Sequence, residues 1–285
     1  MSGADAAAGR YDLAANVSLL FAELPLLERF AAAAGAGFQS TEAWWPFPQS
    51  ASPSREELEG FFSAIEESGI PLSGLNFFAG DMPAGERGVV CLPDRREEFA
   101  ANVAVIAQIA RRTGAGGFNA LYGQVREGTS AEEHDRVAIE NLALAVRTLS
   151  DVGGTVLLEP LSHGLNGAYP VETARQAVEI VGRVREATGL DNIGLLFDTF
   201  HLSNNGEDLA EVIDSHHDLI EHVQIADAPG RGEPGTGSVD VAGAISRLWD
   251  AGYRKLVACE YAPTVPTTES FGWIAGIPQL SLDRK

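Results

Sequence analysis

The chain has 285 residues, and 45% of them are hydrophobic, which is enough to build a full core. Its 40 acidic and 20 basic residues give a formal charge of −20, which repels phosphate backbones and anionic lipid and so argues against nucleic acid and membrane surfaces as partners. The two cysteines are too few for a disulfide framework, and no run approaches the roughly 18 apolar residues of a membrane span, so a cytoplasmic protein is expected.

In chain order, one pattern repeats: a short apolar or β-branched run, a polar loop, and an amphipathic helical stretch. Eight runs predict strands, near 12–18, 37–44, 72–78, 117–123, 155–160, 193–198, 221–227 and 256–261. Seven stretches between them predict helices, at 25–37, 54–69, 96–114, 132–153, 172–189, 206–217 and 240–252. This alternation is typical of parallel strands joined by helical crossovers.

Eight such units in about 260 residues are the expected size of a closed (β/α)8 TIM barrel. We therefore expect one barrel domain over residues 11–285, after a disordered tail over residues 1–10. An open doubly wound sheet is the alternative. Its nucleotide-binding versions are disfavoured because the chain has neither GxGxxG after the first strand nor GxxxxGK[ST].

Active sites of TIM barrels form at the C-terminal ends of the strands, where this sequence places oxygen-bearing side chains. Predicted strands five to eight end at Glu159, at Asp198, at Gln224 or Asp227, and at Glu260. Two negative charges about 4 Å apart cost several kcal/mol even at an effective dielectric constant near 20, so three carboxylates at one mouth favour a bound divalent cation. Oxygen ligands suit Mg²⁺ or Mn²⁺ better than zinc or iron. Capping of the following helices is the alternative role for each acid.

Several short motifs at the strand ends point to a known family. LLEP, FDTFH, HVQIAD, RGEPGTG and CEY follow strands five to eight in order, and NFFAGDMPAGERG follows strand three. From about Leu13 to Trp273 the chain resembles the hydroxypyruvate isomerase family of xylose-isomerase-like TIM barrels. The resemblance implies a metal held by residues matching Glu159, Asp198, Gln224 and Glu260, with both glutamates as the acid/base pair. It also implies that the substrate lies near His201, His163 and Arg231.

The expected reaction moves a carbonyl between adjacent carbons through an enediolate. A metal can bind both oxygens, and two carboxylates on opposite faces of the substrate can divide removal and return of the proton. The predicted substrates are hydroxypyruvate and tartronate semialdehyde, and the alternatives are a 2-oxo-tetronate isomerase or a ketose 3-epimerase with the same site. A non-catalytic sugar-binding barrel and a multi-zinc endonuclease are alternatives from other classes, the latter disfavoured by only six histidines and the acidic charge. The expected partner is a small hydroxy-oxo acid or sugar, with a homo-oligomer left open.

Other candidate residues each have a functional and a structural interpretation. The turn GRGEPGTG can present Arg231 to an anionic substrate, or leave it in solvent. His201 can polarise a substrate oxygen or pack a helix, and His163 can contact substrate or lie on the surface. Asn76, at the end of strand three, and Arg87 in AGDMPAGERG are further candidates for substrate contacts.

The remaining expectations are structural. His222 should fill the barrel interior through hydrogen bonds, and His134 should be solvated at a helix start. Cys259 should face the helices because it precedes inward-facing Glu260. The loop with Trp44 and Trp45 can wall the pocket, contact a second subunit or pack under the loop.

Overall fold

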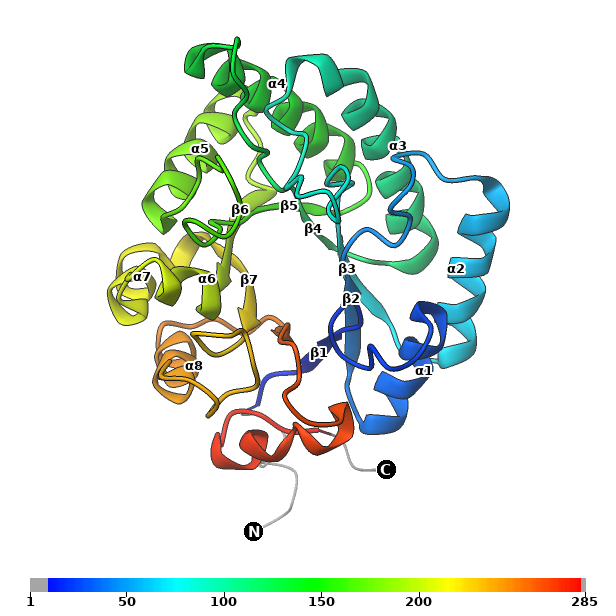
Figure 1. The fold of residues 1–285 in the computed structure, drawn as a ribbon, viewed down its shortest axis with the longest axis vertical. Helices are drawn as coiled ribbons and strands as arrows, with labels where there is room; N and C mark the ends of the chain where they lie inside the picture. The colour runs from blue at the N-terminus through cyan, green and yellow to red at the C-terminus, as the bar shows by residue number, and fades with distance from the viewer. Residues whose placement is uncertain (1–9, 283–285) are drawn as a thin grey trace.

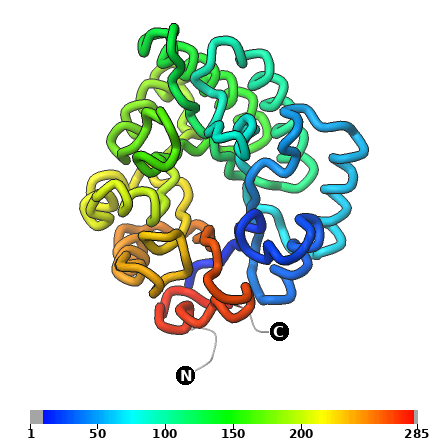
Figure 2. Tube along the Cα trace, viewed as in Figure 1, coloured from blue at the N-terminus to red at the C-terminus, as the bar shows by residue number. Residues whose placement is uncertain are grey.

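In the computed structural model, which describes residues 10–282, eight parallel strands close into a barrel in the order β1 to β8 (Figure 1). The strands are β1 (Leu13–Asn16), β2 (Ser40–Ala43), β3 (Leu72–Asn76), β4 (Gly117–Asn119), β5 (Thr155–Leu158), β6 (Ile193–Asp198), β7 (Ile220–Ile225) and β8 (Val257–Cys259). β8 pairs with β1, so an orange segment near the C-terminus lies beside a blue segment near the N-terminus (Figure 2). The predicted (β/α)8 barrel is confirmed.

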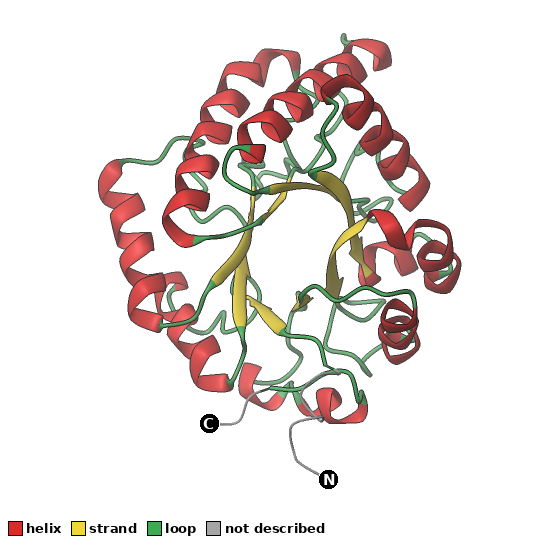
Figure 3. Cartoon of the chain, turned by 180° about the vertical axis from the view of Figure 1, so that it is seen from behind, coloured by secondary structure: helices red, strands yellow, loops and turns green. Residues whose placement is uncertain are grey.

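Helices surround the ring of strands (Figure 3). They are α1 (Leu26–Ala36), α2 (Arg55–Ser68), α3 (Arg96–Thr113), α4 (Ala131–Ser150), α5 (Ala174–Thr188), α6 (Thr199–Asn204), α7 (Leu209–His216) and α8 (Val241–Asp250). Short 3-10 helices cover Pro93–Arg95, His217–Leu219, Thr267–Glu269 and Gly272–Gly276. The seven predicted helices are all present, and α6 is an addition that the sequence patterns missed. None of the helices in residues 10–282 has the length and apolar character needed to cross a bilayer.

Local sequence explains where the helices begin and end. Ser54 begins α2 with a capping box, in which its side chain accepts from the backbone of Glu57 and the Glu57 side chain accepts in return. Thr173 and Gln176 form the same arrangement at α5. Gly69, with φ of 67°, ends α2 in the left-handed conformation that glycine adopts without steric cost.

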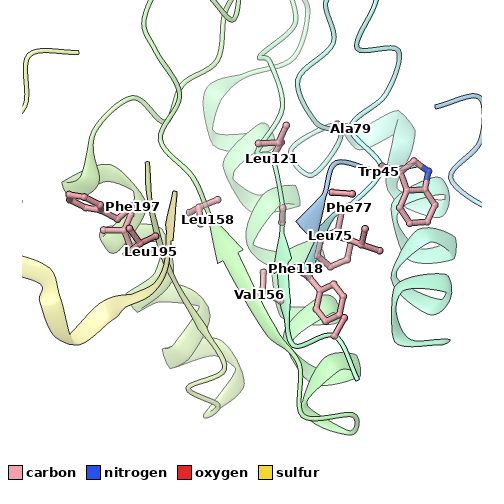
Figure 4. Close-up of a cluster of buried hydrophobic side chains, with 14 of the residues drawn as sticks. Trp45, Leu75, Phe77, Ala79, Phe118, Leu121, Val156, Leu158, Leu195 and Phe197 are labelled. Carbon is pink, nitrogen blue, oxygen red and sulfur yellow. The ribbon is translucent and has the colours of Figure 1, made fainter. Parts of the chain in front are cut away.

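The largest apolar cluster lies between the barrel and the helices. Outward-facing residues of adjacent strands fill it, among them Phe118, Val156, Leu158, Leu195 and Phe197 (Figure 4). Because side chains alternate along a strand, the residues between these point into the barrel. The strands are therefore packed against the helices by an apolar layer, and the inward-facing polar residues lie on the other side of the strands.

The inner face of the barrel carries polar as well as apolar side chains and is open at its N-terminal end. A cavity of about 580 Å³ begins there and reaches Glu42, Asn76 and Gln224. Gly74 and Gly117 line it, and having no side chains they leave space that larger residues usually fill.

Seven of the eight predicted strands run past the C-terminal ends of the observed ones, and the strand predicted at 193–198 ends at Asp198 as β6 does. The strand predicted near 155–160 ends at Leu158, and the one near 256–261 ends at Cys259, so Glu159 and Glu260 are the first residues after pairing stops. Most of the tail predicted over residues 1–10 lies outside the described residues. One domain over residues 11–285 stays a prediction.

Candidate active site

A cavity of about 460 Å³ lies at the C-terminal mouth of the barrel. Six of the residues predicted from the sequence line it, namely Asn76, Arg87, Glu159, His201, Arg231 and Glu260. Trp44 and Trp45 also line it, which favours the pocket-wall interpretation of their loop. The strand-end argument therefore brought together side chains that lie up to 184 residues apart, from Asn76 to Glu260.

Glu159 has one oxygen bound and one free. Its Oε2 accepts a hydrogen bond of 2.6 Å from the side chain of Asn119, whereas its buried Oε1 has no hydrogen-bond partner among the described residues. Burial, with the charges of Glu260 and Asp198, raises the pKa of Glu159 well above its usual value. A carboxylate in this environment gains from any cation or proton that reaches Oε1.

Glu260 is held by two donors from distant loops. Its Oε1 accepts from Trp44 Nε1 at 2.9 Å and from a terminal nitrogen of Arg231 at 2.7 Å. Burial raises the pKa of Glu260 to about 7 even though Arg231 acts in the opposite direction. A group with this pKa can both accept and donate a proton near neutral pH.

Asp198 caps a helix with one carboxylate oxygen and turns the other toward the site. Its Oδ1 accepts from the backbone of Phe200 at 2.7 Å and of His201 at 3.4 Å, which starts α6. Its Oδ2 faces Arg231 at 3.3 Å. Burial raises the pKa of Asp198, against the effects of Arg231 and the two backbone donors. Helix capping thus uses one oxygen and leaves the other directed at the site.

Arg231 lies inside the site. Its guanidinium bridges Asp198 and Glu260 and lies 5.4 Å from the ring centre of Phe200 and 6.0 Å from that of Trp44. Its Nε is buried without a hydrogen-bond partner in the described part of the chain, so one donor stays available. The solvated-arginine alternative does not describe this geometry, because the side chain is only 21% exposed.

The loop that carries Arg231 is organised by Asp227. The four backbone N–H groups that donate to its carboxylate belong to Ala228, Gly235, Gly237 and Val239. Arg231 itself has a φ of 58°, and its carbonyl accepts from the backbone of Ala262. Asp227, which the sequence left as an alternative to Gln224 at the strand end, is therefore a loop-forming residue.

His201 presents an N–H group to the cavity. Its Nδ1 accepts from the backbone N–H of Ser162 at 2.9 Å, so the proton of the neutral ring is on Nε2. Burial keeps the ring neutral by holding the pKa of His201 well below its usual value. Nε2 lies 3.7 Å from Glu159 and 3.9 Å from Asp198, and these three residues have a metal-compatible spacing. With its proton on Nε2, however, His201 is arranged as a donor to an oxygen.

Gln224 points into the barrel toward a residue that the sequence analysis did not single out. Its Nε2 donates to Glu42 at 2.7 Å, whereas its buried Oε1 has no hydrogen-bond partner within residues 10–282. Glu42 also accepts from Asn16 at 3.0 Å and pairs with His222 Nε2 at 2.6 Å. Burial raises the pKa of Glu42, but His222 and the amide donors outweigh it and the net direction is down. The only sequence feature that could have pointed to Glu42 was its position as an acidic residue inside a predicted strand.

The other predicted residues are placed as follows. Asn76 is buried and lines both cavities, and Arg87 is held at the mouth by Asn166, at 3.1 Å, and by two carbonyls. His163 is not brought to the cavity: its side chain is 78% exposed and pairs with Glu172.

The structure also tests the positions predicted for two other histidines and a cysteine. His222 bonds inside the barrel as predicted, and Cys259 is buried in the apolar cluster. The prediction of a solvated His134 is wrong. That histidine is buried, and its two ring nitrogens form hydrogen bonds with the backbone N–H of Arg126 and the backbone carbonyl of Cys91.

Comparison with known proteins agrees with this architecture. Residues 30–277 match the family model described as xylose isomerase-like TIM barrel. A putative hydroxypyruvate isomerase of Streptomyces coelicolor is 48% identical over 91% of this chain and 94% of its own length. The hydroxypyruvate isomerase of Escherichia coli K12 is 32% identical over 91% and 96%, and a 2-oxo-tetronate isomerase of Haemophilus influenzae is 31% identical over the same shares.

Solved structures show the same fold. A crystal structure from Brucella melitensis, described as an AP endonuclease of family 2, superposes with a TM-score of 0.83 at 32% identity. It covers 94% of this chain and 98% of that one. An E. coli 3-keto-D-glucoside 4-epimerase has a TM-score of 0.73 over 94% and 100% of the two chains, and at 20% identity it shows the fold alone. The chain is an isomerase that belongs to the hydroxypyruvate isomerase family of xylose isomerase-like TIM barrels.

Proposed function

We propose that this enzyme interconverts hydroxypyruvate and tartronate semialdehyde. The observation that carries the proposal is the pair of buried glutamates, Glu159 and Glu260, at one mouth beside a histidine N–H donor and a partly free arginine. The names of the relatives from S. coelicolor and E. coli give the same substrate.

The reaction moves one proton between neighbouring carbons and one between their two oxygens. A base takes a proton from C3 of hydroxypyruvate, and the electron pair forms the enediolate. The C3 hydroxyl passes its proton to the C2 oxygen and becomes the aldehyde as an acid returns a proton to C2. Glu159 and Glu260 are the proposed pair, and general acid/base catalysis of this kind contributes about 10²- to 10⁴-fold. The raised pKa values of both carboxyls support this assignment. Their placement on opposite faces of the substrate stays a prediction.

Neighbouring groups would bind and orient the substrate. His201 Nε2–H is proposed to donate to the oxygen on which charge develops, and Arg231 Nε–H to the substrate carboxylate. Arg87 at the rim is a second cation for that carboxylate. Trp44 fixes Glu260 through its indole N–H and closes one wall, which helps to exclude water.

A divalent metal, Mg²⁺ or Mn²⁺, is proposed as the cofactor, held by Glu159, Asp198, Gln224 and Glu260. The buried oxygens of Glu159 and Gln224 that have no donor support this set, and an all-oxygen set suits a hard cation. When bound, the ion would act as a Lewis acid that polarises the substrate oxygens. Arg231, which now lies against two of these carboxylates, partly offsets their charge.

The second candidate is a 2-oxo-tetronate isomerase, because the H. influenzae relative has that name and the chemistry needs the same groups. A ketose 3-epimerase remains a further alternative for the same reason. A cytoplasmic location, expected from the composition, is also part of this proposal. Assembly into a homo-oligomer stays open.

A ¹H NMR panel in D₂O tests the substrate. Hydroxypyruvate, a 2-oxo-tetronate and a ketose are each offered with Mg²⁺, with chelator, or without enzyme. We expect the carbon-bound proton signal to be lost fastest with hydroxypyruvate, and the chelator to stop the exchange. The exposed substitution Glu59→Gln is the matched control for Glu159→Gln and should keep full activity. Fastest exchange in another compound would refute the substrate, and activity unaffected by chelator would refute the metal.

A further inference from the structure

The side chain of Gln224 can point either end of its amide toward the proposed metal position. The oxygen and nitrogen ends have nearly the same shape, but only the oxygen can bind a cation. Since Oε1 is the buried atom without a partner and Nε2 is the bonded one, the observed orientation is the productive one. Something must select it over the flipped amide.

Glu42 is the group in contact with Gln224 that can make this selection. Its Oε1 accepts from Gln224 Nε2 at 2.7 Å. If the amide flipped, two oxygens without a hydrogen between them would face each other at that distance. An acceptor-only carboxylate therefore excludes the flipped amide, whereas a neutral amide at position 42 would tolerate both orientations.

Other residues hold Glu42 in place for this contact. Asn16 donates to its Oε1 at 3.0 Å, and His222 Nε2 lies 2.6 Å from its Oε2. The residue is only 5% exposed. β2 and β7 are not neighbouring strands in the barrel, so these bonds from Glu42 to Gln224 and His222 cross the interior.

We propose that Glu42 is a positioning residue, which fixes the side-chain amide of Gln224 so that its oxygen faces the metal. This inference rests on the metal centre of the proposed function. Glu42 itself does not line the cavity at the C-terminal mouth. Its effect is expected in the affinity for the ion before any turnover takes place.

A double-mutant cycle on Mn²⁺ binding without substrate tests the proposal. Free Mn²⁺ is measured by electron paramagnetic resonance for the full-length protein and for Glu42→Gln, Gln224→Glu and the double variant. We expect Glu42→Gln to raise the Mn²⁺ dissociation constant by about 10- to 100-fold, as is usual when a residue that orients a metal ligand is removed. Glu59→Gln, the same change on an exposed face of α2, should leave it unchanged.

In the Gln224→Glu background the same substitution should act in the opposite direction. There two carboxylates face each other, and replacing Glu42 by glutamine removes the repulsion and supplies a donor, so Mn²⁺ binds more tightly. A merely structural role would weaken binding in both backgrounds. Equal dissociation constants for wild type and Glu42→Gln, or a change of the same direction in both backgrounds, would overturn the proposal.

Two further outcomes are distinguishable. If the wild-type protein binds no Mn²⁺, the metal centre of the proposed function fails and the role of Glu42 fails with it. If wild type binds Mn²⁺ and Glu42→Gln binds equally well, only the role of Glu42 fails. Circular dichroism checks folding. Should Glu42→Gln not fold, the double variant must still bind Mn²⁺ more tightly than Gln224→Glu, or the proposal is wrong.

Discussion

Replacing Asp227 by asparagine should disorganise the loop that places Arg231 in the site. Each oxygen of this carboxylate accepts two backbone N–H groups at 2.8 to 2.9 Å. An asparagine can keep one such pair, but its NH₂ group then faces the two remaining donors. Two buried N–H groups lose their acceptor as a result.

The structure sets the size of the effect. A hydrogen bond to a charged group contributes about 1.5–3 kcal/mol, so two of them correspond to about 3–6 kcal/mol if the loop keeps its conformation. If the loop rearranges instead, less stability is lost but Arg231 moves away from Glu260. The KM for hydroxypyruvate should then rise by about tenfold or more, the equivalent of one charge-assisted bond.

The contribution of Asp227 to stability depends on pH in a definite direction. Burial raises the pKa of Asp227, but the four backbone donors outweigh it and hold the pKa below the usual 3.8. The stability from this carboxylate is therefore fully present above pH 3.8 and is lost as the pH falls through the lower, folded-state value. The difference in unfolding free energy between wild type and Asp227→Asn should narrow in that range.

Denaturant unfolding together with steady-state kinetics checks this prediction. The control is Asp240→Asn, at the start of α8, where the side chain accepts a single backbone N–H and asparagine is an equally good cap. It should cost less than about 1 kcal/mol and leave the KM unchanged. An Asp227→Asn protein with the wild-type midpoint and the wild-type KM would refute the reasoning.

Three further predictions concern the site and the barrel. Glu159→Gln and Glu260→Gln should each lower turnover and solvent-proton exchange by about 10²- to 10⁴-fold with little change in melting temperature, and a variant that retains normal exchange would remove that residue from the acid/base pair. His163→Ala should leave kcat and KM unchanged because the side chain is exposed, so a large loss of activity would place it in the site after all. Gly74→Ala would bring a Cβ to 2.4 Å from the carbonyl oxygen of Gly117, and thermal unfolding should report a loss of about 1–3 kcal/mol; an unchanged melting temperature would show that the strands can separate there without cost.

The barrel could be predicted because its signals are local. The hydrophobic pattern of a short sequence window indicates each strand and each longer helix. The barrel fold then requires the C-terminal ends of the strands to meet at one rim. That rule brought Glu159, His201 and Glu260 together without any knowledge of their distances. The short α6 was missed because it starts directly from the last residue of β6, with no loop to separate them.

The features that the sequence did not predict correctly depend on contacts between residues far apart in the chain. The role of Glu42 depends on Gln224, 182 residues further along the chain, and on a closed barrel in which side chains of β2 and β7 meet across the interior. No spacing in the sequence contains that information. His134 was placed in solvent because it lies in a charged helix start, although its ring faces inward to the carbonyl of Cys91. For a helix, composition alone did not determine which face was buried.

The proposed ion ligands all come from β5 to β8, whereas Trp44, Glu42 and Asn119, which hold three of them in place, come from the first half of the chain. The second half of the chain thus supplies the proposed reacting groups. The first half supplies side chains that hold them in place and part of the cavity wall. Changes in the loops after β2 and β3 can therefore alter which molecules enter the cavity, provided that Trp44 keeps its hydrogen bond to Glu260. A fragment ending before β5 would contain none of the proposed reacting groups.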